Sequence, residues 1–387
     1  MKTITTTDEL ARFCGAAKDQ PYVTIDTEFL RERTYYSKLC LIQMALPGKD
    51  GEAVLVDPLA EGLSLDPLYD LFRHEQTVKV FHAARQDLEI FFVEGKVFPK
   101  PLFDTQVAAM VCGFGEQVGY ETLVKKIARE NLDKSSRFTD WSRRPLSEAQ
   151  QVYALADVTH LRVIYEFLSA ELKRTGRQKW VEEEIAILVD PETYISRPED
   201  AWEKVKTRTT SGRFLAVVRE LARFREEYAQ TRDVPRSRVY KDDALLELAS
   251  TRPTSTEELG RSRLLLREGR KPEIADGILA AVKEGLEMKP EDMPKVVRAA
   301  SPAEEAKQNA LLAYYVNNIS QSSFFQDGKA KASAMSEAEV AQMRGEREGR
   351  VTVALSHFAT IALLPRVLPE FRRRRLFLPA LEKPKMK

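Results

Sequence analysis

Residues 1–175 contain short, apolar, β-branched runs separated by polar turns, and between them lie segments with helical spacing of apolar residues. The short runs predict strands at Tyr22–Phe29, Lys38–Leu46, Glu52–Asp57 and Val78–Phe81. The helical spacing predicts helices at Leu65–Arg73, Ala83–Val93, Thr105–Cys112, Glu121–Glu130 and Ser147–Leu172. Ser147 and Gln150 form a capping-box pair at the start of the last helix. Because the first three strands follow one another through short links, we expect a meander in an α/β domain.

The second half of the chain has no strand pattern as far as Met288. Helical spacing predicts helices at Phe214–Tyr228, Asp242–Ser250, Thr256–Leu259 and Lys271–Gly285, followed by a further one at Asn309–Ile319. The expected organisation is an α/β domain over 1–175, a proline-containing connector over 176–209, a helical domain over 210–290 and a weakly patterned, basic region over 291–387.

Composition narrows the classes of protein. A length of 387 residues predicts two or three domains. Lys and Arg (60) balance Asp and Glu (59), which excludes a basic coat over the whole surface and an acidic disordered tail, but leaves room for a local basic face. Cys14, Cys40 and Cys112 are far apart, which argues against a disulfide framework and a zinc finger. With no expected leader segment or membrane span, we predict a cytoplasmic protein.

Two acidic residues stand at the end of the first predicted strand, in Asp26-Thr27-Glu28. Side chains two positions apart on a strand share a face, so these carboxylates lie side by side. They repel each other unless a cation binds between them, and Mg²⁺ prefers carboxylate oxygens. Taken alone, the motif also fits a solvated strand face.

Three further residues extend this acidic pattern. Asp87 falls in the first turn of the helix after the fourth strand, where a carboxylate could also simply complement the helix dipole. Tyr153 and Asp157 are spaced i, i+4 and therefore share one face of the long helix, with His160 at its edge. A surface helix whose tyrosine packs into the core is the alternative. In combination, these residues predict a carboxylate metal site with a phenol beside it.

The order Asp26/Glu28, Asp87, Tyr153/Asp157 resembles the DEDD superfamily of 3′→5′ exonucleases. Its histidine subclass carries a histidine at the position of Val152, so this chain resembles the tyrosine subclass. The residues around these positions resemble the ribonuclease D family more closely still. The residues that carry this resemblance are Ile25-Asp26-Thr27-Glu28-Phe29, Leu39-Cys40-Leu41-Ile42-Gln43, His82-Ala83-Ala84-Arg85-Gln86-Asp87, Asp140-Trp141 and Tyr153-Ala154-Leu155-Ala156-Asp157.

The resemblance implies a ribonuclease H-like α/β fold, a mixed sheet flanked by helices. It also implies two divalent cations, Mg²⁺ or Mn²⁺, held by Asp26, Glu28, Asp87 and Asp157, with Tyr153 orienting the attacking water. The implied reaction releases nucleoside 5′-monophosphates from RNA with a free 3′ end, with transfer RNA precursors as substrates. Phe29 and His82 are candidates for contact with the terminal nucleotide, although Phe29 fits a core aromatic equally well.

The helical segment resembles the HRDC domain, an all-α nucleic-acid-binding bundle. The carrying residues are Leu221-Ala222-Arg223-Phe224-Arg225-Glu226, Asp233-Val234-Pro235-Arg236 and Asp242-Asp243-Ala244-Leu245. Phe224 replaces the tryptophan expected in this family. Arg236 and Arg238 are candidate substrate-binding residues within a local basic face, and an ordinary mixed-charge surface is the alternative. Residues 291–387 begin like a second, degenerate HRDC bundle.

Two other functions share part of this pattern. A DNA 3′→5′ exonuclease of the proofreading kind would use the same acids, and a catalytically silent nucleic-acid-binding scaffold would need none of them. The HRDC-like segment favours an RNA enzyme over the first, and the complete set of acids argues against the second. The sequence indicates neither a membrane partner nor an obligate protein partner.

Overall fold

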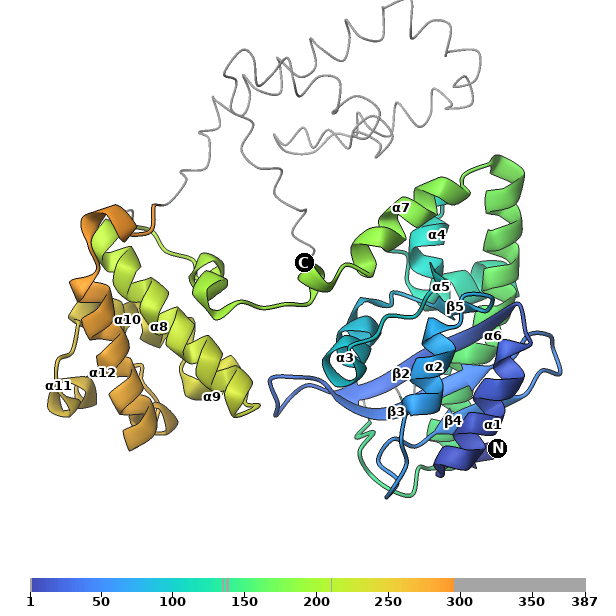
Figure 1. Cartoon of the computed structure of the whole chain (residues 1–387), viewed down its shortest axis with the longest axis horizontal. Coiled ribbons are helices and arrows are strands. Elements are labelled where there is room, and N and C mark those ends of the chain that lie inside the picture. Colours follow the sequence, from blue (N-terminus) through green and yellow to red (C-terminus); the bar gives the residue numbers. More distant parts are fainter. Residues whose placement is uncertain (1, 134–135, 137–138, 210, 296–387) are drawn as a thin grey trace, which may run out of the picture. The chain divides into compact units, whose positions relative to one another are not determined.

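The computed structural model describes residues 2–133, 136, 139–209 and 211–295. Its strands form one mixed sheet in the order β1-β4-β3-β2-β5-β6 (Figure 1). The bounds are β1 (Lys2–Ile4), β2 (Tyr22–Leu30), β3 (Lys38–Ala45), β4 (Ala53–Val56), β5 (Val78–Phe81) and β6 (Leu102–Asp104). β2, β3 and β4 pair antiparallel, which confirms the meander, whereas β1, β5 and β6 pair parallel to their neighbours.

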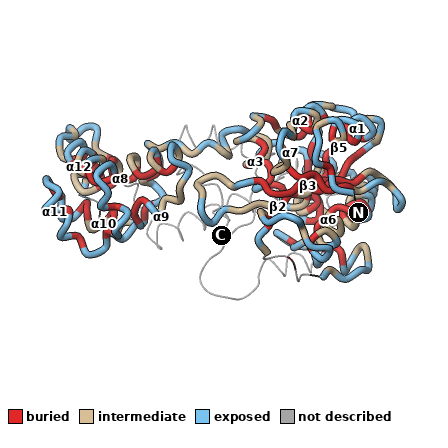
Figure 2. The backbone as a smooth tube through the Cα atoms, turned by 90° about the horizontal axis from the view of Figure 1, so that it is seen from below, coloured by how far each residue is buried: buried red, intermediate tan, exposed pale blue. Residues whose placement is uncertain are grey.

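Helices cover both faces of this sheet, because its central strands are apolar on both sides. On one face Ile25 and Ile42 belong to a core shared with α1 (Thr7–Lys18), α2 (Asp66–Arg73) and α3 (Arg85–Gly95). On the other face Leu41 and Leu55 pack against Ala154 of α6 (Glu148–Thr175). Buried residues accordingly concentrate along the strands and the inner sides of the helices (Figure 2). The predicted mixed sheet flanked by helices is confirmed.

Helix α6 is fixed to the sheet along its length. It begins at the predicted capping box of Ser147 and Gln150, and Gly176 in a left-handed conformation (φ 67°) terminates it. The Thr24 hydroxyl on β2 donates to the Val158 carbonyl at 2.8 Å, and Arg162 donates to the Gly48 carbonyl at 2.8 Å. These bonds hold α6 so that its face with Tyr153 and Asp157 lies next to strand β2.

Shorter helices complete the α/β domain. They are α4 (Thr105–Val111), α5 (Tyr120–Leu123) and the π-helical turn η1 (Val124–Ala128). The single helix predicted over Glu121–Glu130 is therefore α5 followed by a wider turn, which ends where Arg129 adopts φ 59°. Neither α1 nor the three-residue strands β1 and β6 were predicted. The strands are too short to show a pattern. Helix α1 does bury Leu10, Phe13, Cys14 and Ala17 at helical spacing, so it was predictable from its sequence and was overlooked.

The connector is divided between the two cores rather than standing free. Helix α7 (Gln178–Leu188) buries Val181 and Ile185 in the core of the α/β domain. After the short turn η2 (Pro191–Thr193), the 3₁₀ helix η3 (Pro198–Lys204) buries Ala201 in the core of the helical domain. No pattern of residues in the connector indicated this division.

All four helices predicted for the second domain are present, with bounds close to those expected: α8 (Gly212–Thr231), α10 (Asp242–Thr251), α11 (Thr256–Gly260) and α12 (Pro272–Glu287). The short elements α9 (Arg236–Val239), η4 (Glu268–Arg270) and η5 (Pro290–Asp292) were not predicted. A Cβ on Gly277 of α12 would lie 2.1 Å from the Phe224 ring, so the absence of a side chain there lets α8 and α12 approach closely. Phe224 therefore keeps an aromatic packing role.

Two expectations lie outside the described residues: the helix at Asn309–Ile319 and the second HRDC-like bundle. Within the part of the chain that the structure describes, no helix has both the length and the apolar character needed to span a membrane.

Candidate active site

Asp26 and Glu28 lie on β2, on the face of the sheet that α6 covers. Their cross-strand partners on β3 are Gln43 and Leu41, and Leu41 packs toward α6. A β-bulge follows immediately, between Glu28 and Phe29. Bulges bend a strand and redirect its side chains, and they are common beside active sites. The predicted side-by-side placement of the two carboxylates is consistent with this register.

The four acids act on one another electrostatically. Burial raises the pKa of Asp26 well above its ordinary value, and the charges of Asp157, Asp87 and Glu28 raise it further. Residues from β2, α3 and α6 thus converge although 131 positions separate the first from the last (26 to 157). The interpretation of Asp26 and Glu28 as a solvated strand face does not explain this convergence.

Asp87 is buried at the start of α3, with 6% of its surface exposed. The Thr27 hydroxyl, which lies between the two strand acids in sequence, donates a hydrogen bond to Asp87 Oδ1. Burial raises the pKa of Asp87 to about 7 even though this bond opposes the shift. A surface carboxylate that only complements a helix dipole would not be buried, so the simple dipole interpretation does not fit.

Tyr153 shares its side of α6 with Asp157, as the spacing predicted. Burial raises the pKa of its phenol, and the charges of Asp157, Glu28 and Asp26 raise it further, together with a hydrogen bond to Asp157. Its ring lies 5.9 Å from that of Trp141, centroid to centroid. Tyr153 is therefore a neutral phenol at physiological pH, held beside three of the acids.

Sequence reasoning did not identify Tyr120, which fixes this turn of α6. Its hydroxyl donates to the Asp157 carbonyl at 2.6 Å. Burial raises the Tyr120 pKa far above its ordinary value, followed by the charges of Asp157 and Asp26. A tyrosine immediately before a predicted helix carries no pattern that could have distinguished it from a core residue.

Gln43 is a second residue without an assigned role in the sequence interpretation. It is fully buried opposite Asp26, and neither atom of its amide has a hydrogen-bond partner among the described residues. A buried amide is ordinarily hydrogen-bonded, so this one requires an explanation. The available signal was a single polar residue inside the apolar run from Leu39 to Leu46.

His82 lies between β5 and α3, and its ring is 5.3 Å from that of Tyr120. Its Nδ1 is 3.0 Å from the Thr105 hydroxyl, whose own hydrogen is donated to the Phe81 carbonyl. Nδ1 must therefore be the donor, which leaves Nε2 of the neutral ring as an acceptor. Burial lowers the His82 pKa, which favours this neutral form.

Phe29 packs partly buried against the main core of the α/β domain, as the core interpretation expects. Contact of Phe29 or His82 with a terminal nucleotide stays a prediction.

Metal binding fits the chemistry of this site. Carboxylate oxygens are the ligands that Mg²⁺ and Mn²⁺ prefer, and a cation would relieve the repulsion that raises the Asp26 pKa. Among the described residues, no three His, Cys, Asp or Glu side chains are already gathered closely enough to form a ligand shell. The fit therefore rests on the donor atoms and their mutual repulsion rather than on a finished coordination geometry.

The two arginines proposed for substrate binding lie in different environments. Arg236 forms an ion pair with Glu226, whose side chain is 1% exposed. Arg238 is exposed and forms no ion pair within the described part of the chain. RNA binding by either stays a prediction, but Arg236 already has a partner inside the protein.

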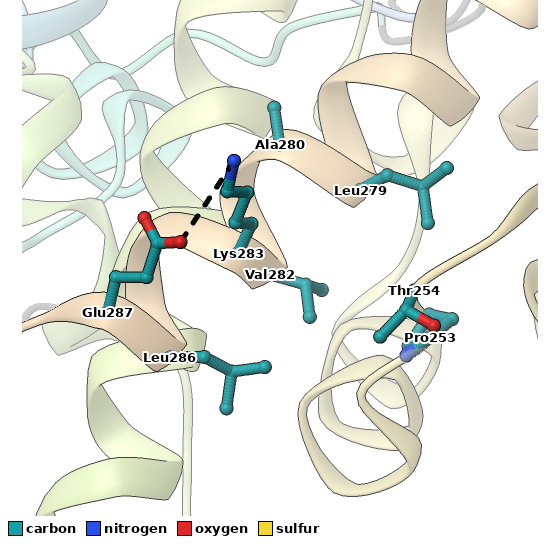
Figure 3. A pocket seen from close by; sticks show the side chains of 8 residues that line it. All are labelled: Pro253, Thr254, Leu279, Ala280, Val282, Lys283, Leu286 and Glu287. Atoms are coloured by element: carbon teal, nitrogen blue, oxygen red, sulfur yellow. Dashed lines mark ion pairs between the residues drawn. The ribbon is translucent and has the colours of Figure 1, made fainter.

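A pocket of about 410 Å³ lies elsewhere, on the helical domain (Figure 3). Its walls are largely apolar, from Leu279, Val282 and Leu286 of α12 and from Pro253. The charged pair at its edge, Lys283 and Glu287, is 4.0 Å apart. None of the acids described above lines it, so this pocket has no part in the candidate active site.

Comparison with protein families finds one match in each of the two domains. Residues 1–173 match the model of a 3′-5′ exonuclease domain, and residues 214–282 match the model of the HRDC domain. The first match contains the five candidate catalytic residues, Asp26, Glu28, Asp87, Tyr153 and Asp157. The second contains Arg236 and Arg238.

Relatives and a solved structure agree with this division. The chain is 67% identical to ribonuclease D of Jannaschia sp. (strain CCS1) over 295 residues, which are 76% of each protein. It is 44% identical to ribonuclease D of Nitrobacter hamburgensis over 367 residues, 92% of this chain and 95% of that one. The crystal structure of Escherichia coli RNase D matches with a TM-score of 0.76 at 28% identity, covering 96% of this chain and 98% of the other. The chain therefore belongs to the ribonuclease D family of 3′→5′ exoribonucleases.

Proposed function

We propose that this exoribonuclease uses two divalent cations to remove nucleoside 5′-monophosphates from RNA 3′ ends, with transfer RNA precursors among its cytoplasmic substrates. The observation that carries the proposal is the convergence of four carboxylates, in which Asp157, Asp87 and Glu28 each raise the pKa of Asp26. Cys14, Cys40 and Cys112 are free thiols, which suits a reducing compartment.

The acids have the following roles in the proposed mechanism. Asp26, at the centre of the electrostatic cluster, would hold the cations together with Glu28, Asp87 and Asp157, with Glu28 and Asp157 acting on the side of Tyr153. When bound, divalent cations would neutralise the phosphoryl oxygens and lower the pKa of the attacking water.

Tyr153 orients that water. Because its pKa lies above the ordinary value for a phenol, the hydroxyl stays protonated and works as a hydrogen-bonding group rather than as a base. His82 Nε2, the free acceptor of a neutral ring, suits a sugar hydroxyl of the terminal nucleotide. Phe29 contacts the terminal nucleotide through its ring, which lies at the edge of the core.

The substrate class rests on the helical domain. An HRDC match and an exposed Arg238, which has no ion-pair partner among the described residues, support contact with RNA beyond the terminal nucleotide. The E. coli RNase D whose structure matches is described as an exoribonuclease involved in structured RNA processing. A transfer RNA precursor with a 3′ extension combines a structured body with a free single-stranded end.

The test is digestion of a transfer RNA with a 3′ extension and of matched RNA and DNA single strands, with Mg²⁺, with Mn²⁺ and with EDTA. We expect 5′-monophosphate products only when metal is present. Asp26→Asn should lower turnover by at least about 10³-fold, since it removes the charge of the acid on which the other three act, while Glu273→Gln, an exposed carboxylate of the helical domain, serves as the matched control. Full turnover in EDTA or in Asp26→Asn contradicts the metal mechanism, and equal use of DNA favours the proofreading type of enzyme.

A further inference from the structure

The loop that follows β2 reaches the helical domain. Residues 31–37 connect β2 to β3, and the backbone N–H groups of Tyr35 and Tyr36 both donate to Asp233 Oδ1, each at 3.0 Å. Asp233 follows α8 and adopts φ 48°, a left-handed conformation that few residues other than glycine and asparagine accept readily. The end of α8 is therefore shaped to accept this loop.

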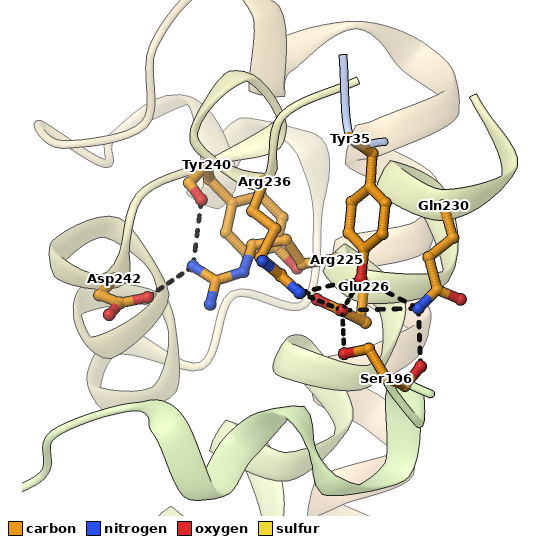
Figure 4. Close-up of polar contacts among 8 residues, drawn as sticks. All are labelled: Tyr35, Ser196, Arg225, Glu226, Gln230, Arg236, Tyr240 and Asp242. Atoms are coloured by element: carbon orange, nitrogen blue, oxygen red, sulfur yellow. Dashed lines mark hydrogen bonds and ion pairs between the residues drawn. The ribbon is translucent and has the colours of Figure 1, made fainter. Parts of the chain in front are cut away.

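The Tyr35 side chain enters a cluster of polar groups, here called the Glu226 cluster: Tyr35, Ser196, Glu226, Gln230 and Arg236 (Figure 4). The Tyr35 hydroxyl donates to Glu226 and accepts from Arg236 Nη2 at 2.9 Å and from Gln230 Nε2 at 3.2 Å. A hydroxyl has one donor and two acceptor positions, so all three are used. The Arg236 guanidinium also lies over the Tyr35 ring, 4.8 Å from its centroid.

Further hydrogen bonds within the Glu226 cluster satisfy the Glu226 carboxylate. Arg236 donates to both carboxylate oxygens of Glu226, and the Ser196 hydroxyl donates to Glu226 Oε1 at 2.9 Å. A buried carboxylate is stable only when it is paired and hydrogen-bonded in this way. Tyr35 is the member that comes from the α/β domain, and it completes the cluster.

The base of the same loop is attached to α3, the helix that carries Asp87. Arg31 makes a two-pronged ion pair with Glu89 of α3, at 3.0 and 3.1 Å. Glu89 lies two residues after Asp87, and Arg31 lies three residues after Glu28. The loop is thus held at one end beside two of the catalytic acids and at the other end by the helical domain.

We propose that Tyr35 is a positioning residue for exonucleolysis: the Glu226 cluster and Asp233 hold the β2–β3 loop, and through it the end of β2, in the geometry needed for turnover. The helical domain then contributes to the chemical step even when RNA does not touch it. The proposal rests on the exoribonuclease activity of the family and not on the identity of the natural substrate.

The test uses the full chain and a short single-stranded oligoribonucleotide in Mg²⁺, with kcat and KM measured separately. Tyr35→Phe removes only the hydroxyl and Glu226→Gln only the charge. We expect each to lower kcat between about tenfold and about 10²-fold, the scale of small misplacements in an active site, with KM and its salt dependence unchanged. Glu273→Gln, which removes an exposed ion pair with Arg232 elsewhere in the same domain, should leave kcat unchanged.

The double variant separates positioning from direct contact. If Tyr35 acts through Glu226, Tyr35→Phe combined with Glu226→Gln should be no slower than the slower single variant. Multiplied effects, a raised KM, or wild-type kcat in both single variants would overturn the proposal, while a wild-type enzyme inactive on RNA would indicate that the exoribonuclease assignment itself had failed.

Variants of Asp233 test the same proposal without disturbing the buried charge of Glu226. Asp233→Asn keeps the acceptor for the two N–H groups and tolerates the left-handed backbone, whereas Asp233→Gly loses the acceptor but not the backbone conformation. We expect Asn to retain wild-type kcat and Gly to lose it by about the same factor as Tyr35→Phe. Equal kcat for the two variants, with unfolding midpoints near that of the wild type, contradicts the role of this hydrogen-bonded pair.

Discussion

Tyr153 carries no charge at neutral pH. Its phenol stays protonated because burial and three neighbouring carboxylates raise its pKa. Tyr153→Phe keeps the ring beside Trp141 and removes only the hydroxyl. We expect turnover on RNA to fall by about 10²–10³, the effect of losing one positioned polar group, with little change in Mg²⁺ affinity.

Metal titration followed by calorimetry, run beside single-turnover assays, separates the two effects of Tyr153→Phe. An equal loss of Mg²⁺ affinity would mean that Tyr153 shapes the metal site instead of orienting water.

Glu226 makes a pH-dependent contribution to stability. Burial alone would raise its pKa, but hydrogen bonds from Arg236 and Tyr35 lower the pKa from the ordinary 4.5 to about 2. Since the folded pKa lies below the unfolded one, the stabilisation is complete above about pH 5 and is lost as the pH falls toward 2. Its size is on the order of 3 kcal/mol.

Arg236→Gln should therefore lower the free energy of unfolding by more at pH 7 than at pH 3, as measured by chemical denaturation across this range. Arg261→Gln is the matched control, because its pair with Glu257 is exposed on both sides and contributes little. The same loss of stability at both pH values in Arg236→Gln would show that packing of the guanidinium, and not its charge, is what matters.

The residues of the site were predictable to different degrees for a physical reason. Asp26 and Glu28, and also Tyr153 and Asp157, were paired correctly because the periods of strand and helix fix which side chains share a face. Gln43 opposite Asp26 depends on strand register, and Tyr120 beneath Asp157 depends on how one helix packs on another. Local spacing contains neither kind of information.

At the scale of elements, some basic side chains of the helical domain already form ion pairs with acids, and others are exposed. Arg232, Arg236, Arg261 and Lys271 pair with acids of the same domain, whereas Arg238 at the end of α9 is exposed and forms no ion pair among the described residues. The sequence alone placed Arg236 and Arg238 together in one candidate face. Of these two, Arg238 is the better candidate for binding phosphate, because Arg236 is paired with Glu226.

Arg238→Glu should weaken binding of a structured RNA. The slope of log K against log[salt] should also become shallower, by about 0.7–0.9 for each phosphate that the variant no longer neutralises. Lys283→Glu makes the same change of charge on α12, at the edge of the apolar pocket, and should leave the slope unchanged. Filter-binding across a salt series measures both. Identical slopes for the two variants would mean that Arg238 does not bind phosphate.

Element prediction succeeded where hydrophobic periodicity is long and its ends are marked. Helix α6 has a capping box at one end and a left-handed glycine at the other, so both its existence and its start were predictable. Strands β1 and β6 have three residues each and depend on their neighbours in the sheet. The hydrogen bond between Tyr35 and Asp233 joins residues 198 positions apart, which no local pattern can indicate.

At the scale of the whole chain, the α/β domain extends further than its sequence pattern. The predicted boundary at 175 would remove α7, whose Val181 and Ile185 are buried in the core of that domain. Tyr194 also belongs to it, because its ring lies 5.4 Å from that of Phe98. Each buried side chain of this kind contributes about 1.5–3 kcal/mol, so a fragment ending at Gly176 should unfold at a lower temperature than one ending at Ile195.

The fragment 1–195 tests the contribution of the helical domain as a whole. It keeps Asp26, Asp157 and α7 but ends before Ser196, so the Glu226 cluster cannot form. On a short oligoribonucleotide we expect kcat to fall by the same factor as in Tyr35→Phe, between about tenfold and about 10²-fold, because the β2–β3 loop loses its support. On a structured RNA the salt dependence of binding should also flatten, by about 0.7–0.9 in slope for each phosphate that the helical domain neutralises in the full chain. Wild-type kcat on the short strand would show that the loop holds its position without the helical domain, and an unchanged slope would show that this domain does not bind RNA.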